Sequence, residues 1–225
     1  MKITKLLILI ALLSSLLAGC VAFRSGLQGE YQGEAQKKIG SKPVNVLFHF
    51  THLSQTRGLD AIPKVVGKNS VIMSFDNVFS DALPELENLG SFATFTDDAG
   101  DVNHPERRAL LDSLIKANDY TVNIRFTQEH KFSTFFLGGC LSTVTATLFP
   151  VPYHWTYKME TSLRRNDGTV IATYSRRARL TNWVEALLLI AYPFAPQDRE
   201  REEIFIEMFH DTFKQINSEN VLTVS

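Results

Sequence analysis

The chain has 225 residues, 44% of them hydrophobic, and its 23 basic and 24 acidic residues nearly balance. This length is enough for one domain with a substantial core, and the small net charge creates no field that would attract nucleic acid. We therefore expect no nucleic-acid partner. The two cysteines, Cys20 and Cys140, exclude a disulfide-rich scaffold.

The first twenty residues have the pattern of a bacterial export signal. Two lysines precede an almost wholly apolar run, Leu6–Leu17, which ends in Leu17-Ala18-Gly19-Cys20. A spanning helix needs about 20 apolar residues, so this run is too short for an uncleaved anchor. It resembles the bacterial lipoprotein signal, in which residues 1–19 are removed and the cysteine, here Cys20, is lipidated with palmitate and other acyl chains.

The lipoprotein resemblance also implies a location. In that family the residue after the lipidated cysteine directs sorting, and Val21 in place of aspartate favours the outer membrane, with the domain facing the periplasm. With Cys20 lipidated, Cys140 has no partner within the chain. Because Cys140 lies in an apolar run, we expect it to be buried as a small hydrophobic residue.

Residues 20–43 are rich in glycine, glutamine and lysine, with little apolar periodicity. This composition predicts a flexible tether. A single folded domain is therefore expected over residues 44–225.

Apolar residues repeat with the period of strands or helices along the first part of this domain. In chain order they predict a strand over 44–50, a connection over 51–69, a helix over 70–89 with a kink near Pro84, a strand over 91–96, a helix over 105–117 and a strand over 120–127.

Two runs without Lys, Arg, Asp or Glu, residues 133–157 and 186–197, flank a predicted β-hairpin. The hairpin turns at Asn166-Asp167-Gly168, and a final helix follows over 198–216. This order predicts an α/β domain, with α+β as the alternative. We expect a mixed sheet of four to five strands, covered by two to three helices, with an apolar insertion before the hairpin.

The charge-free runs have two interpretations. They are either core elements that close the domain or an exposed surface that contacts a membrane or a partner. The candidate contact residues are Phe135, Phe136, Leu141, Phe149, Trp183, Leu187 and Leu188.

Catalytic and metal sites are not indicated by the sequence. His49 and His52 are three apart on a predicted strand, so their side chains point to opposite faces and cannot share a metal unless the strand bends. We expect neither a metal nor a cofactor, and no catalytic residue, although a cysteine-dependent hydrolase using Cys140 with His154 is an alternative.

A cluster of basic residues, Arg176, Arg177 and Arg179, has two interpretations. It is either an anionic-lipid site or the solvated end of a strand near Arg164-Arg165.

Several short patterns resemble a small periplasmic α/β domain. This domain occurs in the TolB amino-terminal region, the curli-secretion lipoprotein and activators of penicillin-binding proteins. The patterns are Phe79-x-x-Ala82-Leu83, Leu89-Gly90-x-Phe92, Ala117-x-x-Tyr120-x-Val122 and the Asp167-Gly168 hairpin. The chain also looks like proteobacterial outer-membrane lipoproteins, through Leu141-Ser142, Pro150 and Trp183.

The resemblance implies a non-enzymatic scaffold or accessory binding module, by analogy of fold alone. We expect it to be anchored by lipid at Cys20 and to bind an envelope protein. A carrier of lipid or of a small apolar ligand is the alternative, in which the charge-free runs line a cavity.

Overall fold

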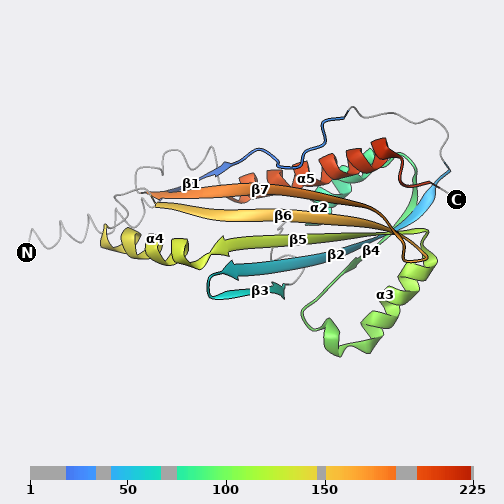
Figure 1. The fold of residues 1–225 in the computed structure, drawn as a ribbon, viewed down its shortest axis with the longest axis horizontal. Coiled ribbons are helices and arrows are strands. Elements are labelled where there is room, and N and C mark those ends of the chain that lie inside the picture. Colours follow the sequence, from blue (N-terminus) through green and yellow to red (C-terminus); the bar gives the residue numbers. More distant parts are fainter. Residues whose placement is uncertain (1–18, 34–41, 67–74, 146–150, 186–196, 224–225) are drawn as a thin grey trace, which may run out of the picture.

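The computed structural model describes residues 19–33, 42–66, 75–145, 151–185 and 197–223. Seven strands within these residues form one mixed sheet (Figure 1). They are β1 (Gly19–Arg24), β2 (Val44–Arg57), β3 (Asp60–Val65), β4 (Leu89–Thr96), β5 (Tyr120–Lys131), β6 (Val151–Arg165) and β7 (Val170–Glu185). The mixed α/β class is confirmed, but the sheet is larger than the predicted four to five strands.

Four α-helices and two short 3-10 helices occur in the same residues. They are α2 (Phe75–Ala82), α3 (Pro105–Ala117), α4 (Phe132–Val144), α5 (Gln197–Glu219), η1 (Leu83–Glu85) and η2 (Asp101–Asn103). The kink expected near Pro84 is the change from α2 to η1, because proline cannot donate a helical hydrogen bond.

The strands follow the order β1-β7-β6-β5-β2-β3, and β4 also pairs with β2. β5, β6, β7 and β1 are antiparallel neighbours, whereas β2 runs parallel to β5. On its other edge, β2 pairs with β4 through its first half and with β3 through its second half. The predicted connection over 51–69 thus contains the end of β2 and the whole of β3.

One face of the sheet holds the core, covered by α2 and α5. Phenylalanine rings dominate it, and Phe48 contacts Phe79 of α2 at 4.9 Å and Phe213 of α5 at 5.7 Å between ring centroids. Such aromatic contacts contribute about 0.5–1.5 kcal/mol beyond the buried area. The final helix predicted over 198–216 is confirmed as α5.

The N-terminal segment differs from the flexible tether expected over 20–43. Residues 19–24 form β1, and beyond it the Gln28 and Arg177 backbones exchange hydrogen bonds. Arg24 binds three carboxylates of α5, and its distances to Glu200, Glu203 and Glu207 are 3.5, 3.2 and 2.5 Å. Residues 34–41 lie outside the described residues. The start of the expected tether is therefore part of the folded domain.

Candidate functional site

The strand register brings β1, which contains Cys20, to the same end of the sheet as α4 (Figure 1). Cys20 pairs with Val184 of β7, and Val184 pairs with Val151 of β6. Two strand spacings separate Cys20 from Val151, a distance of about 10 Å between backbones. Val151 in turn contacts α4, because a Cβ built on Gly138 would lie 2.9 Å from its Cγ1.

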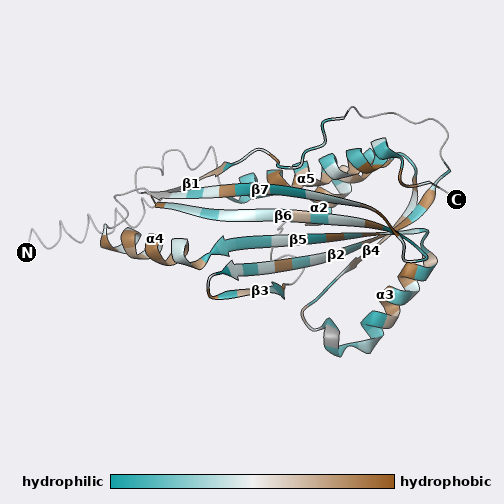
Figure 2. Cartoon of the chain, viewed as in Figure 1, coloured by the Kyte–Doolittle hydropathy of each residue, from teal (hydrophilic) through white to brown (hydrophobic). Residues whose placement is uncertain are grey.

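The outer surface of α4 is apolar and exposed. The helix contains no charged residue, and Figure 2 shows it as a mostly hydrophobic segment at one end of the sheet. Its exposed large hydrophobic side chains are Phe132, Phe136, Leu137, Leu141 and Val144, with exposed fractions of 36%, 56%, 65%, 49% and 84%. Two of the predicted contact residues, Phe136 and Leu141, therefore lie on an exposed apolar surface.

The β2–β3 turn adds a further apolar side chain at this end. Gly58 has a φ of 109°, which favours glycine, and a Cβ built there would lie 3.8 Å from the Cβ of Phe132. Leu59 follows directly and is 70% exposed. The sequence interpretation missed this turn because its glycine and proline residues were taken for an irregular connection.

The inner surface of α4 packs on aromatic rings. The ring of Phe135 lies 5.1 Å from Tyr153, 5.0 Å from Trp155 and 4.7 Å from His130. Gly138 is buried beside them, and any Cβ there would approach the Tyr153 ring to 3.1 Å. Phe135 is thus a packing residue that holds α4 on β6, with only part of its surface exposed.

Cys140 is exposed on α4, so the prediction of a buried thiol is wrong. It lies in an apolar hollow with Phe135, Phe136 and Val144. The thiol is exposed because the sheet covers α4 on one side only. His154 lines a different hollow. The structure does not bring together the two residues of the alternative hydrolase.

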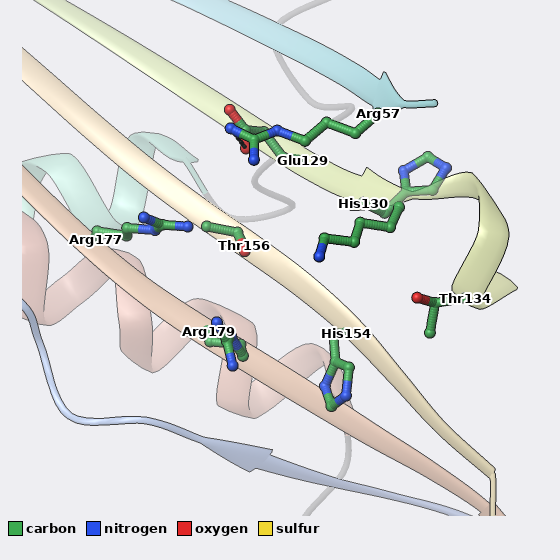
Figure 3. A pocket seen from close by; sticks show the side chains of 9 residues that line it. Arg57, Glu129, His130, Thr134, His154, Thr156, Arg177 and Arg179 are labelled. Atoms are coloured by element: carbon green, nitrogen blue, oxygen red, sulfur yellow. Dashed lines mark ion pairs between the residues drawn. The ribbon is translucent and has the colours of Figure 1, made fainter. Parts of the chain in front are cut away.

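A basic cleft of about 230 Å³ lies on the polar face of the sheet, next to the first turn of α4 (Figure 3). Its side chains come from β2, β5, β6, β7 and α4. They are Arg57, Glu129, His130, Lys131, Thr134, His154, Thr156, Arg177 and Arg179.

The positive charge of this cleft is largely uncompensated. Arg57 lies 3.4 Å from Glu129, the only carboxylate among the lining residues. Within the described part of the chain, Lys131, Arg177 and Arg179 form no ion pair. Burial, followed by the positive charges of Arg179 and Lys131, lowers the pKa of His154 below its usual value. The cleft thus favours neutral histidine and would attract an anion.

The three arginines grouped by the sequence interpretation separate in the structure. Arg176 is buried on the core face and binds Asp211, whereas Arg177 and Arg179 are exposed in the cleft. Arg177 and Arg179 lie inside β7 and not at the strand end near Arg164-Arg165. The register shows this, because it places Arg177 opposite Lys158. The strand alternation accounts for this separation, since successive side chains face opposite sides.

A second polar cluster lies farther along the same face. The Nδ1 of His49 is 2.9 Å from Oδ1 of Asn123, its Nε2 is 2.8 Å from Oδ1 of Asp97, and the Thr51 hydroxyl donates to Asp97 at 2.6 Å. His52 points to the core, between Phe75 and Phe126. The prediction that His49 and His52 face opposite sides is confirmed.

The remaining candidate contacts are only partly described. Trp183 is half-buried on β7, opposite Pro152. Phe149, Leu187 and Leu188 lie outside the described residues, as does most of the charge-free run over 186–197.

Two further findings concern metals and membranes. Over the described ranges, no three metal-ligating side chains come together. Within the same ranges, every helix is too short or too polar to cross a bilayer.

Comparison with known proteins does not assign a family. No family model matches the sequence, and no curated protein matches it. Among solved structures, the PelC dodecamer from Paraburkholderia phytofirmans is similar at 8% identity and a TM-score of 0.30, over 85% of this chain and 96% of that one. Lipoprotein GNA1162 from Neisseria meningitidis is similar at 14% identity and a TM-score of 0.28, over 61% and 83%.

Proposed function

We propose that this protein is a lipid-anchored outer-membrane lipoprotein whose domain rests on the membrane through α4. In this proposal it is a non-enzymatic accessory module that faces the periplasm and binds an envelope partner. The observation that carries the proposal is the register that links Cys20 through Val184 to Val151 and α4.

The position of Cys20 within β1 supports direct contact with the membrane. A lipidated cysteine lies at the membrane surface, and in this chain it is already part of the sheet. The end of the sheet is then held at that surface, with α4 beside it. Acyl chains supply the main affinity, and the exposed apolar residues of α4 add to it and fix the orientation.

The charge distribution supports the same orientation. Lys131 immediately precedes the apolar surface of α4, and Arg57 precedes Leu59 by two residues. Apolar residues flanked by cations are typical of segments that lie in the membrane interface. The half-buried Tyr153 and Trp155 fit this level, where aromatic rings are enriched.

The test uses the unlipidated mature chain, residues 20–225 with Cys20→Ser, and flotation with vesicles of a zwitterionic phospholipid. We expect measurable binding that Leu141→Glu reduces at least ten-fold, since a leucine side chain contributes about 1.5–3 kcal/mol on burial and a charge opposes insertion.

Val170→Glu is the matched control. Val170 is as exposed as Leu141, at 49%, and begins β7 at the opposite end of the sheet. This variant should bind like the parent chain. Equal binding by the two glutamate variants, or no binding by the parent chain, would refute membrane contact through α4.

A further inference from the structure

We propose that the basic cleft beside α4 binds the phosphate group of an anionic phospholipid. This inference rests on the proposed membrane contact and names the lipid chemistry that the domain would recognise there. Lys131, Arg177 and Arg179 provide the charge, and Thr134 and Thr156 provide hydroxyl donors.

The buried and half-buried arginines of the described residues are ion-paired, whereas the cations of the cleft are exposed and mostly unpaired. Arg24 binds three glutamates, Arg107 binds Asp101, and Arg176 binds Asp211. In the cleft, by contrast, three of the four cations have no carboxylate partner among the described residues. Clustered charges of one sign repel each other, and a bound anion removes that repulsion.

The lower edge of the cleft lies close to the membrane-facing end of the sheet. His154 is three residues from Val151 along β6, a distance of about 10 Å at the rise of a strand. Val151 is level with Cys20 through the strand register. The polar layer of one leaflet is about 5–8 Å thick. The lower edge of the cleft, at His154, therefore lies just above it, and Arg179 and Arg177, opposite Thr156 and Lys158, lie farther from the membrane.

The position next to α4 favours a lipid over a free anion. Lys131 and Phe132 are consecutive, and Thr134 of the same helix lines the cleft. A phospholipid can therefore place its phosphate among the cations while its acyl chains contact the apolar surface of α4. Arginine guanidinium groups bind phosphate oxygens in pairs of hydrogen bonds, which suits Arg177 and Arg179.

The first measurement compares vesicle binding of the unlipidated mature chain with and without anionic phosphatidylglycerol. Each cation at a membrane surface contributes about 1 kcal/mol, so Arg177→Gln with Arg179→Gln should weaken binding to anionic vesicles about thirty-fold. The same pair should leave binding to zwitterionic vesicles unchanged. That second result separates this inference from the membrane contact of α4, which zwitterionic vesicles test alone.

Arg164→Gln with Arg165→Gln is the matched control, because it removes the same two charges. Both residues are exposed, and Arg164 is ten residues from His154 along β6, a distance of about 34 Å. This exceeds the screening length of about 8 Å in physiological salt. We expect the control to bind anionic vesicles like the parent chain; equal losses in the two double variants would overturn the cleft assignment.

The second measurement needs no membrane. His154 is titrated by nuclear magnetic resonance with a short-chain phosphatidylglycerol below its micelle concentration, and separately with inorganic phosphate. The lipid should raise the pKa of His154 in the parent chain and not in the Arg177→Gln, Arg179→Gln variant. An unchanged pKa, or an equal response to inorganic phosphate at the same concentration, would overturn the assignment to a lipid.

Discussion

Arg176 and Arg177 are neighbours in sequence but serve opposite faces of the sheet. Arg176 is 3% exposed on the core face and binds Asp211, which also accepts the backbone N–H of Tyr31 at 3.0 Å. Arg177 is exposed in the basic cleft. Arg176 thus contributes to stability, whereas its neighbour Arg177 has the proposed role in binding.

Asp211→Ala should destabilise the fold strongly, because it leaves Arg176 buried without its counter-charge. We expect a loss of about 3 kcal/mol in the free energy of unfolding. Urea denaturation of the unlipidated mature chain measures it. Arg177→Gln, next to Arg176, is the control and should change stability by no more than about 0.5 kcal/mol. Similar values for both variants would contradict the buried pair.

Gly138 and Gly139 form a second matched pair. A Cβ at Gly138 would meet Val151 at 2.9 Å, whereas one at Gly139 would meet nothing within 4 Å. Gly138→Ala should therefore cost about 1–3 kcal/mol and loosen α4 from β6. Gly139→Ala should stabilise the helix by up to about 1 kcal/mol.

Urea denaturation and hydrogen exchange of the α4 amides measure the two effects. The critical result is that the two substitutions change the free energy of unfolding in opposite directions. If Gly138→Ala is as stable and as protected as the parent chain, α4 does not pack on β6 in the way described.

The His49–Asp97 pair should make stability depend on pH. Although burial opposes the charge of His49, the hydrogen bond and negative charge of Asp97, together with the Asn123 hydrogen bond, raise the pKa of His49. Hydrogen bonds from His49 and Thr51 lower the pKa of Asp97 against the opposing effect of burial. The stabilisation from His49 is thus complete below about pH 6.5, the usual histidine value, and disappears as pH rises through its higher folded value.

His49→Gln provides the comparison for this pair. The difference in unfolding free energy between parent and variant should be larger at pH 5.5 than at pH 8.5, measured by urea denaturation. The contribution of Asp97 follows the opposite sign, since it is complete above the usual pKa of aspartate and is lost in acid. A difference that is constant from pH 5.5 to 8.5 would show that His49 does not gain charge on folding.

The sequence predicted the elements with strict apolar periods and missed those without them. Residues 105–117 and the alternating strand from Tyr120 followed a single period, and both were found. β3 was missed because most of its residues are exposed and it contains Pro63, which is tolerated at the edge of a sheet. β1 was missed because its six residues span the expected cleavage site.

The candidate site was harder to predict, because it depends on contacts between distant residues. Alternation alone places Arg177 and Arg179 on one face and Arg176 on the other. Arg177 and Arg179 line the same cleft as Arg57 and Lys131 because the strands follow the order β2-β5-β6-β7. The sequence does not specify this order. The apolar composition of α4 was evident, but its exposure was not, since hydrophobic residues all round a helix are equally typical of a buried one.

Cys140 gives a direct reporter of membrane contact. In the unlipidated mature chain with Cys20→Ser it is the only cysteine, and it is exposed on α4. A soluble maleimide should therefore label the native protein without denaturant. Phospholipid vesicles should slow labelling at least ten-fold, because α4 enters the interface and the reagent does not reach the thiol there.

A cysteine at the opposite end of the sheet distinguishes contact through α4 from general adsorption. Cys140→Ser with Val170→Cys places the only thiol near the hairpin turn, at a residue that is 49% exposed. Vesicles should leave its labelling rate unchanged. Equal protection at both positions would indicate that the domain adsorbs without orientation, and no protection at Cys140 would show that α4 stays in water. Protection at Cys140 alone would show that α4 faces the membrane, as expected if Cys20 and α4 lie at the same, membrane-facing end of the sheet.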